Sequence, residues 1–105
     1  MIIDKSLSII VPVYNSEKTI EKCLLKIIDE VKKIKIKELE IIAVDDNSKD
    51  NTNSIIKKFK EIKLIKLKKN KGVGYARNVG ARLAKNEILC YIDSDLIISE
   101  NSILT

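Results

Sequence analysis

Residues 87–95 of this sequence read EILCYIDSD, an apolar run that ends in two carboxylates. The run is β-branched, aromatic or aliphatic at most positions, which predicts a buried strand. Side chains two apart on an extended segment point to the same side, so Asp93 and Asp95 would converge at the end of this strand. Converging carboxylates repel each other unless a cation lies between them, and a hard divalent ion such as Mg²⁺ or Mn²⁺ is the usual one. The motif alone leaves open a simpler alternative, an acidic turn that caps the next segment.

Upstream of this run, apolar strands alternate with amphipathic helical patterns. Strands are predicted at residues 6–13, 40–44, 63–67 and 87–92, and the third, in which lysine alternates with apolar residues, is predicted to be an exposed edge. Helices are predicted between them: one capped by Ser16, one capped by Asp50 or Asn51, and one at 75–84. This βαβαβαβ order predicts an α/β fold, a mostly parallel, Rossmann-like sheet with helices on both faces.

Composition restricts the classes of protein and partner. The length of 105 residues suits one domain spanning 1–105, and 33% charged with 45% hydrophobic residues indicates a globular chain. A net charge of +5 favours anionic partners, whereas the 4% aromatic content argues against nucleic acid as the partner. The absence of histidine argues against a zinc site, and the two cysteines are predicted to be buried free thiols. With no signal peptide and no apolar run long enough to span a bilayer, a cytoplasmic location is predicted.

Polar residues follow three of the predicted strands, at 12–15, 45–46 and 93–95. In a parallel sheet, ligands bind outside the carboxyl ends of the strands, so these residues predict one binding site. It is neither a dinucleotide site nor a P-loop, because GxGxxG does not follow the first strand and GxxxxGK[ST] is absent.

Four motifs carry a resemblance that covers nearly the whole chain. They are SIIVPVYN at 8–15, EIIAVDDNSKDNT at 40–52, NKGVGYARNVG at 70–80 and YIDSD at 91–95. In this order and spacing they resemble family 2 glycosyltransferases of the GT-A fold. The sequence departs from the family at Asn47, where glycine is frequent, and it lacks the proline that often follows Leu96, which leaves the subfamily open.

The resemblance implies roles for individual residues. Asp46 would accept a hydrogen bond from the base, Gly72 would let its loop pass close to the donor, and Asp93 and Asp95 would bind the metal, with Asp95 favoured as the direct ligand. Arg77 would reach a phosphate or support Asp93, although an ordinary ion pair is an equal alternative. Asp45 would bind nucleotide or only hold its loop. Pro12 and Tyr14 would lie along the base, and Asn15 and Glu17 would line the same pocket.

The function implied is the donor-binding part of a metal-dependent, inverting glycosyltransferase. The expected donor is a nucleotide-diphosphate sugar, UDP-linked in the first instance with GDP or dTDP as alternatives, and the expected cofactor is Mg²⁺ or Mn²⁺. The expected acceptor is a glycan or polyprenyl phosphate, with peripheral association at the inner face of the membrane and formation of an oligomer as further expectations. No catalytic residue is expected in this chain, since the general base would lie beyond Thr105, so residues 1–105 alone are expected to transfer little sugar.

Two other functions remain open on sequence grounds. One is a non-catalytic nucleotide-binding or assembly module derived from the same fold. The other is a basic nucleic-acid-binding domain, which only the net charge favours.

Overall fold

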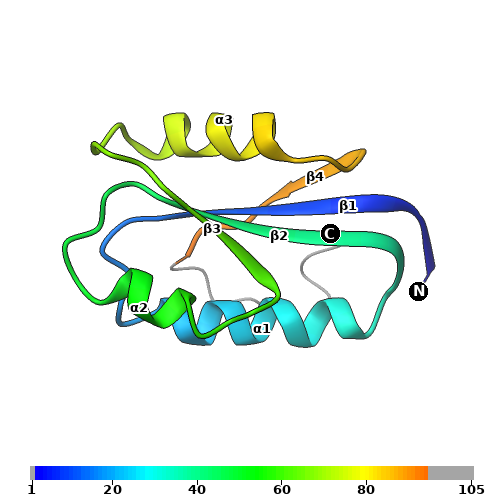
Figure 1. The fold of residues 1–105 in the computed structure, drawn as a ribbon. Coiled ribbons are helices and arrows are strands. Elements are labelled where there is room, and N and C mark those ends of the chain that lie inside the picture. The colour runs from blue at the N-terminus through cyan, green and yellow to red at the C-terminus, as the bar shows by residue number, and fades with distance from the viewer. Residues whose placement is uncertain (1, 95–105) are drawn as a thin grey trace.

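The computed structural model describes residues 2–94, with side chains described from Lys5 onward. Its single sheet has the strand order β3-β2-β1-β4, and every neighbouring pair is parallel (Figure 1). The predicted α/β class and element order are confirmed. The elements are β1 (Ile2–Val13), α1 (Ile20–Lys32), β2 (Lys35–Asp45), α2 (Thr52–Ile56), β3 (Ile62–Lys66), α3 (Val73–Leu83) and β4 (Ile88–Tyr91).

Helices cover both faces of the sheet. In Figure 1, α1 and α2 lie on one face and α3 lies on the other. Alternation along β1 explains the division, because Ile9 and Val11 pack in the cluster of α1 and α2 whereas Ile10 packs with Ala76 of α3. Both central strands are therefore buried on their two faces, as their continuous apolar sequences predict.

Helix α3 lies very close to the sheet at Gly80. Ala76 and Gly80, four residues apart on one face, are its two buried residues, and both have small side chains. A Cβ atom placed on Gly80 would lie 2.5 Å from Ile10 Cγ2 and 3.2 Å from Val44 Cγ2. Both neighbours are β-branched side chains of the close-packed core that move aside only with difficulty, so glycine is the residue that fits at this contact.

We therefore expect Gly80→Ala to lower the free energy of unfolding by about 1–3 kcal/mol, the usual cost of overpacking a core. Urea titration followed by circular dichroism would measure it. Gly74→Ala is the matched control, since a Cβ at Gly74 meets nothing within 4 Å. The control should gain up to about 1 kcal/mol from the better helix propensity of alanine. Equal stability of the two variants would contradict the close packing of α3.

Strand β4 corrects one prediction. Residues 87–92 were expected to form a buried strand, but Ile88, Leu89 and Tyr91 are 37%, 38% and 46% exposed. The reason is position, because among residues 2–94 β4 pairs only with β1 and lies at the edge of the sheet. Cys90 in this strand is accordingly half-buried, whereas Cys23 is buried, and the two cysteines do not form a disulfide.

The start of α1 is a second correction. Ser16 was predicted to cap this helix, yet the helix begins at Ile20 and Thr19 occupies the capping position. The Ser16 carbonyl accepts hydrogen bonds from the amides of Thr19 and Ile20, so a turn precedes the helix. The start of α2 was predicted correctly: it follows Asn51, and the Asp50 carboxylate accepts from the Thr52 amide at 2.9 Å.

A buried carboxylate that the sequence reasoning passed over joins four elements. Glu40 of β2 is 5% exposed and accepts hydrogen bonds from Ser8 Oγ of β1 at 2.6 Å, the Lys85 amide after α3 at 2.7 Å and Lys63 Nζ of β3 at 2.8 Å. Burial raises the pKa of Glu40, but the hydrogen bonds from Lys63, Ser8 and Lys85 outweigh it and lower the pKa to about 2. Glu40 is therefore ionised at neutral pH and fully hydrogen-bonded.

No helix within residues 2–94 is long and apolar enough to cross a membrane.

Candidate functional site

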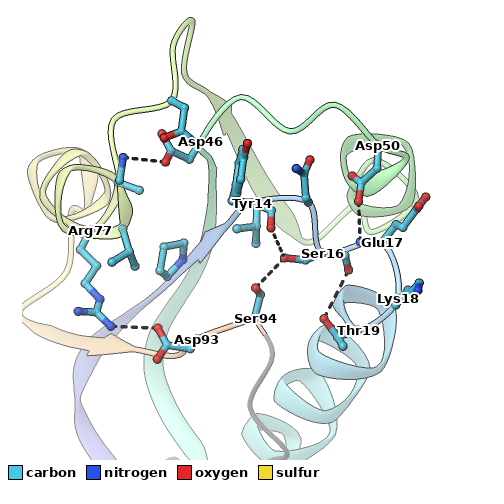
Figure 2. Close-up of a pocket in the computed structure, with 17 residues that line it drawn as sticks. Tyr14, Ser16, Glu17, Lys18, Thr19, Asp46, Asp50, Arg77, Asp93 and Ser94 are labelled. Atoms are coloured by element: carbon cyan, nitrogen blue, oxygen red, sulfur yellow. Dashed lines mark hydrogen bonds and ion pairs between the residues drawn. The ribbon is translucent and has the colours of Figure 1, made fainter.

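A cavity of about 950 Å³ lies at the carboxyl ends of β1, β2 and β4, beside the first turns of α3 (Figure 2). All eight residues predicted to bind the donor line it, although they come from four separate segments of the chain. Their assigned roles remain predictions. These residues are Pro12, Tyr14, Asn15, Glu17, Asp46, Gly72, Arg77 and Asp93.

Pro12 lies at a position in β1 where a missing amide breaks no hydrogen bond between strands. The Ile10 carbonyl accepts from the Ile92 amide beyond β4, and backbone groups two residues further on face the same side. The pairing of β1 with β4 ends at Tyr91, so the side of Pro12 that lacks an N–H faces the cavity instead of a strand.

The turn after β1 is locked to the loop after β2. Asn15, with φ of 46°, donates its amide to Ser48 Oγ, and its side-chain oxygen accepts from the Lys49 amide, both at 2.8 Å. Asn15 therefore shapes the cavity wall by tying two loops together, besides lining the cavity. A left-handed φ is one that asparagine tolerates better than most residues, which explains its presence here.

A second pair of contacts joins the same two segments, so that the turn after β1 and the loop after β2 form a continuous seam. The Glu17 amide donates to Asp50 Oδ2, and the Asn51 amide donates to Glu17 Oε2, each at 3.2 Å. Burial raises the pKa of Asp50, but hydrogen bonds from Thr52 and from the Glu17 amide outweigh it, so its pKa lies below the usual range. Asp50 is thus a charged acceptor at the rim of the cavity.

Asp46 holds the loop that directly precedes α3. Its Oδ1 accepts from the Lys71 amide at 2.7 Å and its Oδ2 from the Gly72 amide at 2.8 Å, and the residue is only 4% exposed. Gly72 has a φ of 93°, a conformation that side chains disfavour, which explains the glycine. Each carboxylate oxygen retains a second lone pair, so Asp46 can still accept from a ligand.

The neighbouring Asp45 has the local role that the sequence left as an alternative. It is buried and accepts from the amide and hydroxyl of Ser48 and from Asn53 Nδ2. It does not line the cavity. Asp45 therefore shapes the loop and does not face the cavity.

At the other end of the cavity Arg77 pairs with Asp93, with Arg77 Nη2 3.0 Å from Asp93 Oδ1 (Figure 2). Both side chains are roughly half-exposed. Among the described residues, the buried Arg77 Nε has no hydrogen-bond partner. It is the half-exposed part of the guanidinium, and not the buried Nε, that is well suited to an anionic group of a ligand in the cavity.

Ser94 was not singled out from the sequence. Its hydroxyl lies 2.9 Å from Ser16 Oγ, and both residues are buried in the cavity wall. The two serines are 78 positions apart, so no local pattern could have revealed the contact.

The residues described here fit a divalent cation only in part. Within 2–94, no three acidic, cysteine or histidine side chains gather into a cluster that could hold a metal by themselves. Asp93 offers a half-exposed carboxylate at the cavity, and Mg²⁺ is often held by one or two carboxylates together with phosphate oxygens of a substrate. Asp95, the predicted direct ligand, lies outside the described residues.

The sequence match decides the family. The family model described as glycosyl transferase family 2 matches residues 8–104. The chain belongs to this family. The predicted resemblance is therefore confirmed over almost the full length of the chain.

Curated relatives agree with this assignment. The glycosyltransferase GlyG of Streptococcus pneumoniae is 33% identical over 103 residues, which are 94% of this chain and 33% of that protein. The poly(ribitol-phosphate) β-N-acetylglucosaminyltransferase TarP of Staphylococcus aureus is 32% identical over 94% of this chain and 31% of its own length. The chain thus spans about a third of the length of these two relatives.

Solved structures of family members share the fold. Staphylococcus aureus TarS in complex with UDP-GlcNAc matches with a TM-score of 0.77 and 36% identity, over 86% of this chain and 26% of that one. The mannosyltransferase PcManGT of Pyrobaculum calidifontis, in complex with GDP-Man and Mn²⁺, matches with a TM-score of 0.77 and 28% identity, over 89% and 28%. The GT-A type of α/β sheet expected from the sequence is confirmed.

Proposed function

We propose that this family 2 chain forms the donor site of a metal-dependent glycosyltransferase and binds a nucleotide-diphosphate sugar, with UDP as the first choice of nucleotide. The observation that carries the proposal is that the two ends of the cavity have different side chains. Figure 2 shows Asp46 and Tyr14 toward one side and the Asp93–Arg77 pair toward the other. A nucleotide has the same two ends, a base with hydrogen-bond donors and a charged diphosphate.

The base would lie against Tyr14 and Pro12. Tyr14 is 48% exposed, so its ring has a free face on which a base can stack. The free lone pairs of Asp46 would accept from the N–H of the base, and Asn15 and Glu17 would complete the wall. The UDP and UDP-GlcNAc complexes of TarS support UDP, and the GDP-Man complex of PcManGT supports GDP as the alternative.

The diphosphate would lie near Asp93 and Arg77. The Arg77 side chain is 40% exposed, so the exposed N–H groups of its guanidinium can donate to phosphate oxygen, and Gly72 lets the backbone approach the donor. Asp93, together with Asp95, would hold a Mg²⁺ or Mn²⁺ ion. When bound, such an ion offsets the negative charge that grows on the leaving nucleoside diphosphate. The Mn²⁺ in the PcManGT complex supports this cofactor.

The acceptor would be a glycan or a polyprenyl-linked carrier at the inner face of the membrane. Support comes from two relatives: the poly(ribitol-phosphate) β-glucosyltransferase of Bacillus spizizenii, and the Escherichia coli β-1,3-glucosyltransferase WfaP, whose acceptor is α-D-GlcNAc-diphosphoundecaprenol. Transfer would invert the anomeric carbon, with the acceptor hydroxyl deprotonated by a base or the acceptor already anionic.

Calorimetric titration of UDP, GDP and dTDP, each with and without Mn²⁺, tests the donor site. UDP is expected to bind with a dissociation constant below about 1 mM, and Mn²⁺ is expected to tighten it about tenfold or more, since a cation relieves repulsion between Asp93 and the diphosphate. If none of the three nucleotides binds below millimolar concentration, the proposed donor site is wrong. If the affinity for UDP is the same with and without Mn²⁺, the proposed metal site is wrong and the proposed nucleotide site is retained.

A further inference from the structure

The central residue of the Asp93-Ser94-Asp95 motif makes a contact that the proposed donor site does not explain. The Ser94 hydroxyl lies 2.9 Å from the Ser16 hydroxyl. Ser94 is 8% exposed and Ser16 is 9% exposed, so water competes little for either group. A hydrogen bond between two buried hydroxyls holds their backbones in a fixed relation.

The direction of this hydrogen bond follows from counting protons. Ser16 Oγ also lies 3.1 Å from the carbonyl oxygen of Tyr14, and a carbonyl can only accept. A serine hydroxyl has one proton, so Ser16 must donate to Tyr14 if both contacts are hydrogen bonds. Ser94 is then the donor to Ser16. The chain of contacts runs from Ser94 through Ser16 to the backbone of Tyr14.

Ser16 itself is fixed from a third side. Its amide donates to Thr52 Oγ1 at 2.8 Å, and the Thr52 hydroxyl donates to the Asp50 carboxylate. Ser16 therefore cannot turn away to follow Ser94 without breaking contacts to the loop after β2. Any displacement of the segment at Ser94 is resisted by the segment that carries Tyr14.

We propose that Ser94 is a positioning residue that couples the two ends of the donor site. It sets the backbone at Asp93 against the backbone at Tyr14, through Ser16. The inference rests on the proposed function, in which Asp93 lies at the diphosphate end and Tyr14 at the base end. When a nucleotide stacks on Tyr14, its diphosphate then lies next to the Asp93 carboxylate, whose distance from Tyr14 is already fixed. Nucleotide and cation therefore strengthen each other's binding.

The test compares UDP affinity with and without Mn²⁺ in wild type, Ser94→Ala and Ser54→Ala. Ser54 is exposed on α2 and is the matched control, for which no change is expected. In Ser94→Ala the ratio of the two affinities should fall about fivefold, the usual effect of one hydrogen bond. Ser16→Ala should lower the ratio similarly, and the ratio in the double variant should fall no further than in either single variant, since both residues belong to the same chain of contacts that ends at Tyr14. An unchanged ratio in Ser94→Ala would overturn the coupling.

A ligand-free measurement separates this inference from the proposed function. Amide chemical shifts of Asn15 and Ser16 should change in Ser94→Ala and stay unchanged in Ser54→Ala. If these shifts do not move, the contact itself is wrong. If the shifts move but the wild-type protein binds no nucleotide, the Ser94–Ser16 contact is correct and the proposed function is wrong. The coupling role proposed for Ser94 is then wrong as well, because it depends on nucleotide binding.

Discussion

Asp46→Ala is expected to weaken UDP binding by about 100-fold, because hydrogen bonds to a charged group contribute about 1.5–3 kcal/mol each and this residue would make several. The substitution acts twice. It removes the acceptor proposed for the base, and it releases the amides of Lys71 and Gly72, which its two oxygens hold at 2.7 and 2.8 Å. The wall formed by the loop before α3 would then lose its anchor on β2. Calorimetry with UDP and Mn²⁺ measures the loss.

Asp46→Asn sharpens this prediction. Asparagine has nearly the same shape, but it offers one oxygen where the aspartate offers two, so its NH₂ group would face a backbone N–H of Lys71 or Gly72. We expect this variant to lose most of the same affinity. Asp29→Ala, on the exposed outer side of α1, removes the same charge far from the cavity lining and should bind UDP like the wild type. Retention of UDP affinity within about threefold in both Asp46 variants would contradict the assignment.

Glu40→Gln is expected to lower the free energy of unfolding by about 3 kcal/mol at neutral pH, because a pKa that folding shifts from 4.5 to about 2 corresponds to that much stabilisation. The carboxylate is 3% exposed, so solvent screens it little. Glutamine would keep one acceptor for Ser8 and Lys85 but would turn an NH₂ group toward Lys63 Nζ. The contact that is lost therefore joins β2 to β3.

The same residue predicts a pH dependence with a defined sign. Folding lowers the pKa of Glu40, so its stabilisation is complete above about pH 4.5 and is lost as the pH falls toward about 2. Urea unfolding at neutral pH and at about pH 3 should therefore show the gap between wild type and Glu40→Gln shrinking by roughly half or more. Glu38→Gln, an exposed residue on the same strand, is the control and should differ little from wild type at either pH. A constant gap would show that Glu40 is not an ionised, hydrogen-bonded carboxylate.

Much of the fold could be predicted because its signals are local. Continuous apolar runs marked β1 and β2 as central strands, and alternating lysines marked β3 as an edge, which the order β3-β2-β1-β4 bears out among the described strands. The close approach of α3 is also a local property, because Ala76 and Gly80 lie four residues apart on one face and have small side chains. Pro12, Asp46 and Asp93 could be assembled into one site because the carboxyl ends of parallel strands meet at one edge.

The features that could not be predicted depend on contacts between residues that are distant in the sequence. Ser16 was expected to cap α1, but its hydroxyl is engaged by Tyr14 and by Ser94, 78 positions away. Glu40 gave no signal because Ser8 and Lys85 are 32 and 45 positions from it. The exposure of β4 follows from its place in the sheet, which its own apolar sequence does not encode. The role of Asp95 stays a prediction, since it lies outside the described residues.

The seam between the turn after β1 and the loop after β2 has a consequence for how the protein folds. Its contacts, such as Asn15 with Ser48 and Glu17 with Asp50, join residues 33 positions apart. We expect the two loops to come together only after β1 and β2 have paired, because closing so long a loop costs more conformational entropy than a few surface hydrogen bonds offset. The cavity should therefore form late, after the sheet. Protection of the Asn15 and Glu17 amides against hydrogen exchange during refolding would then lag behind that of the central strands.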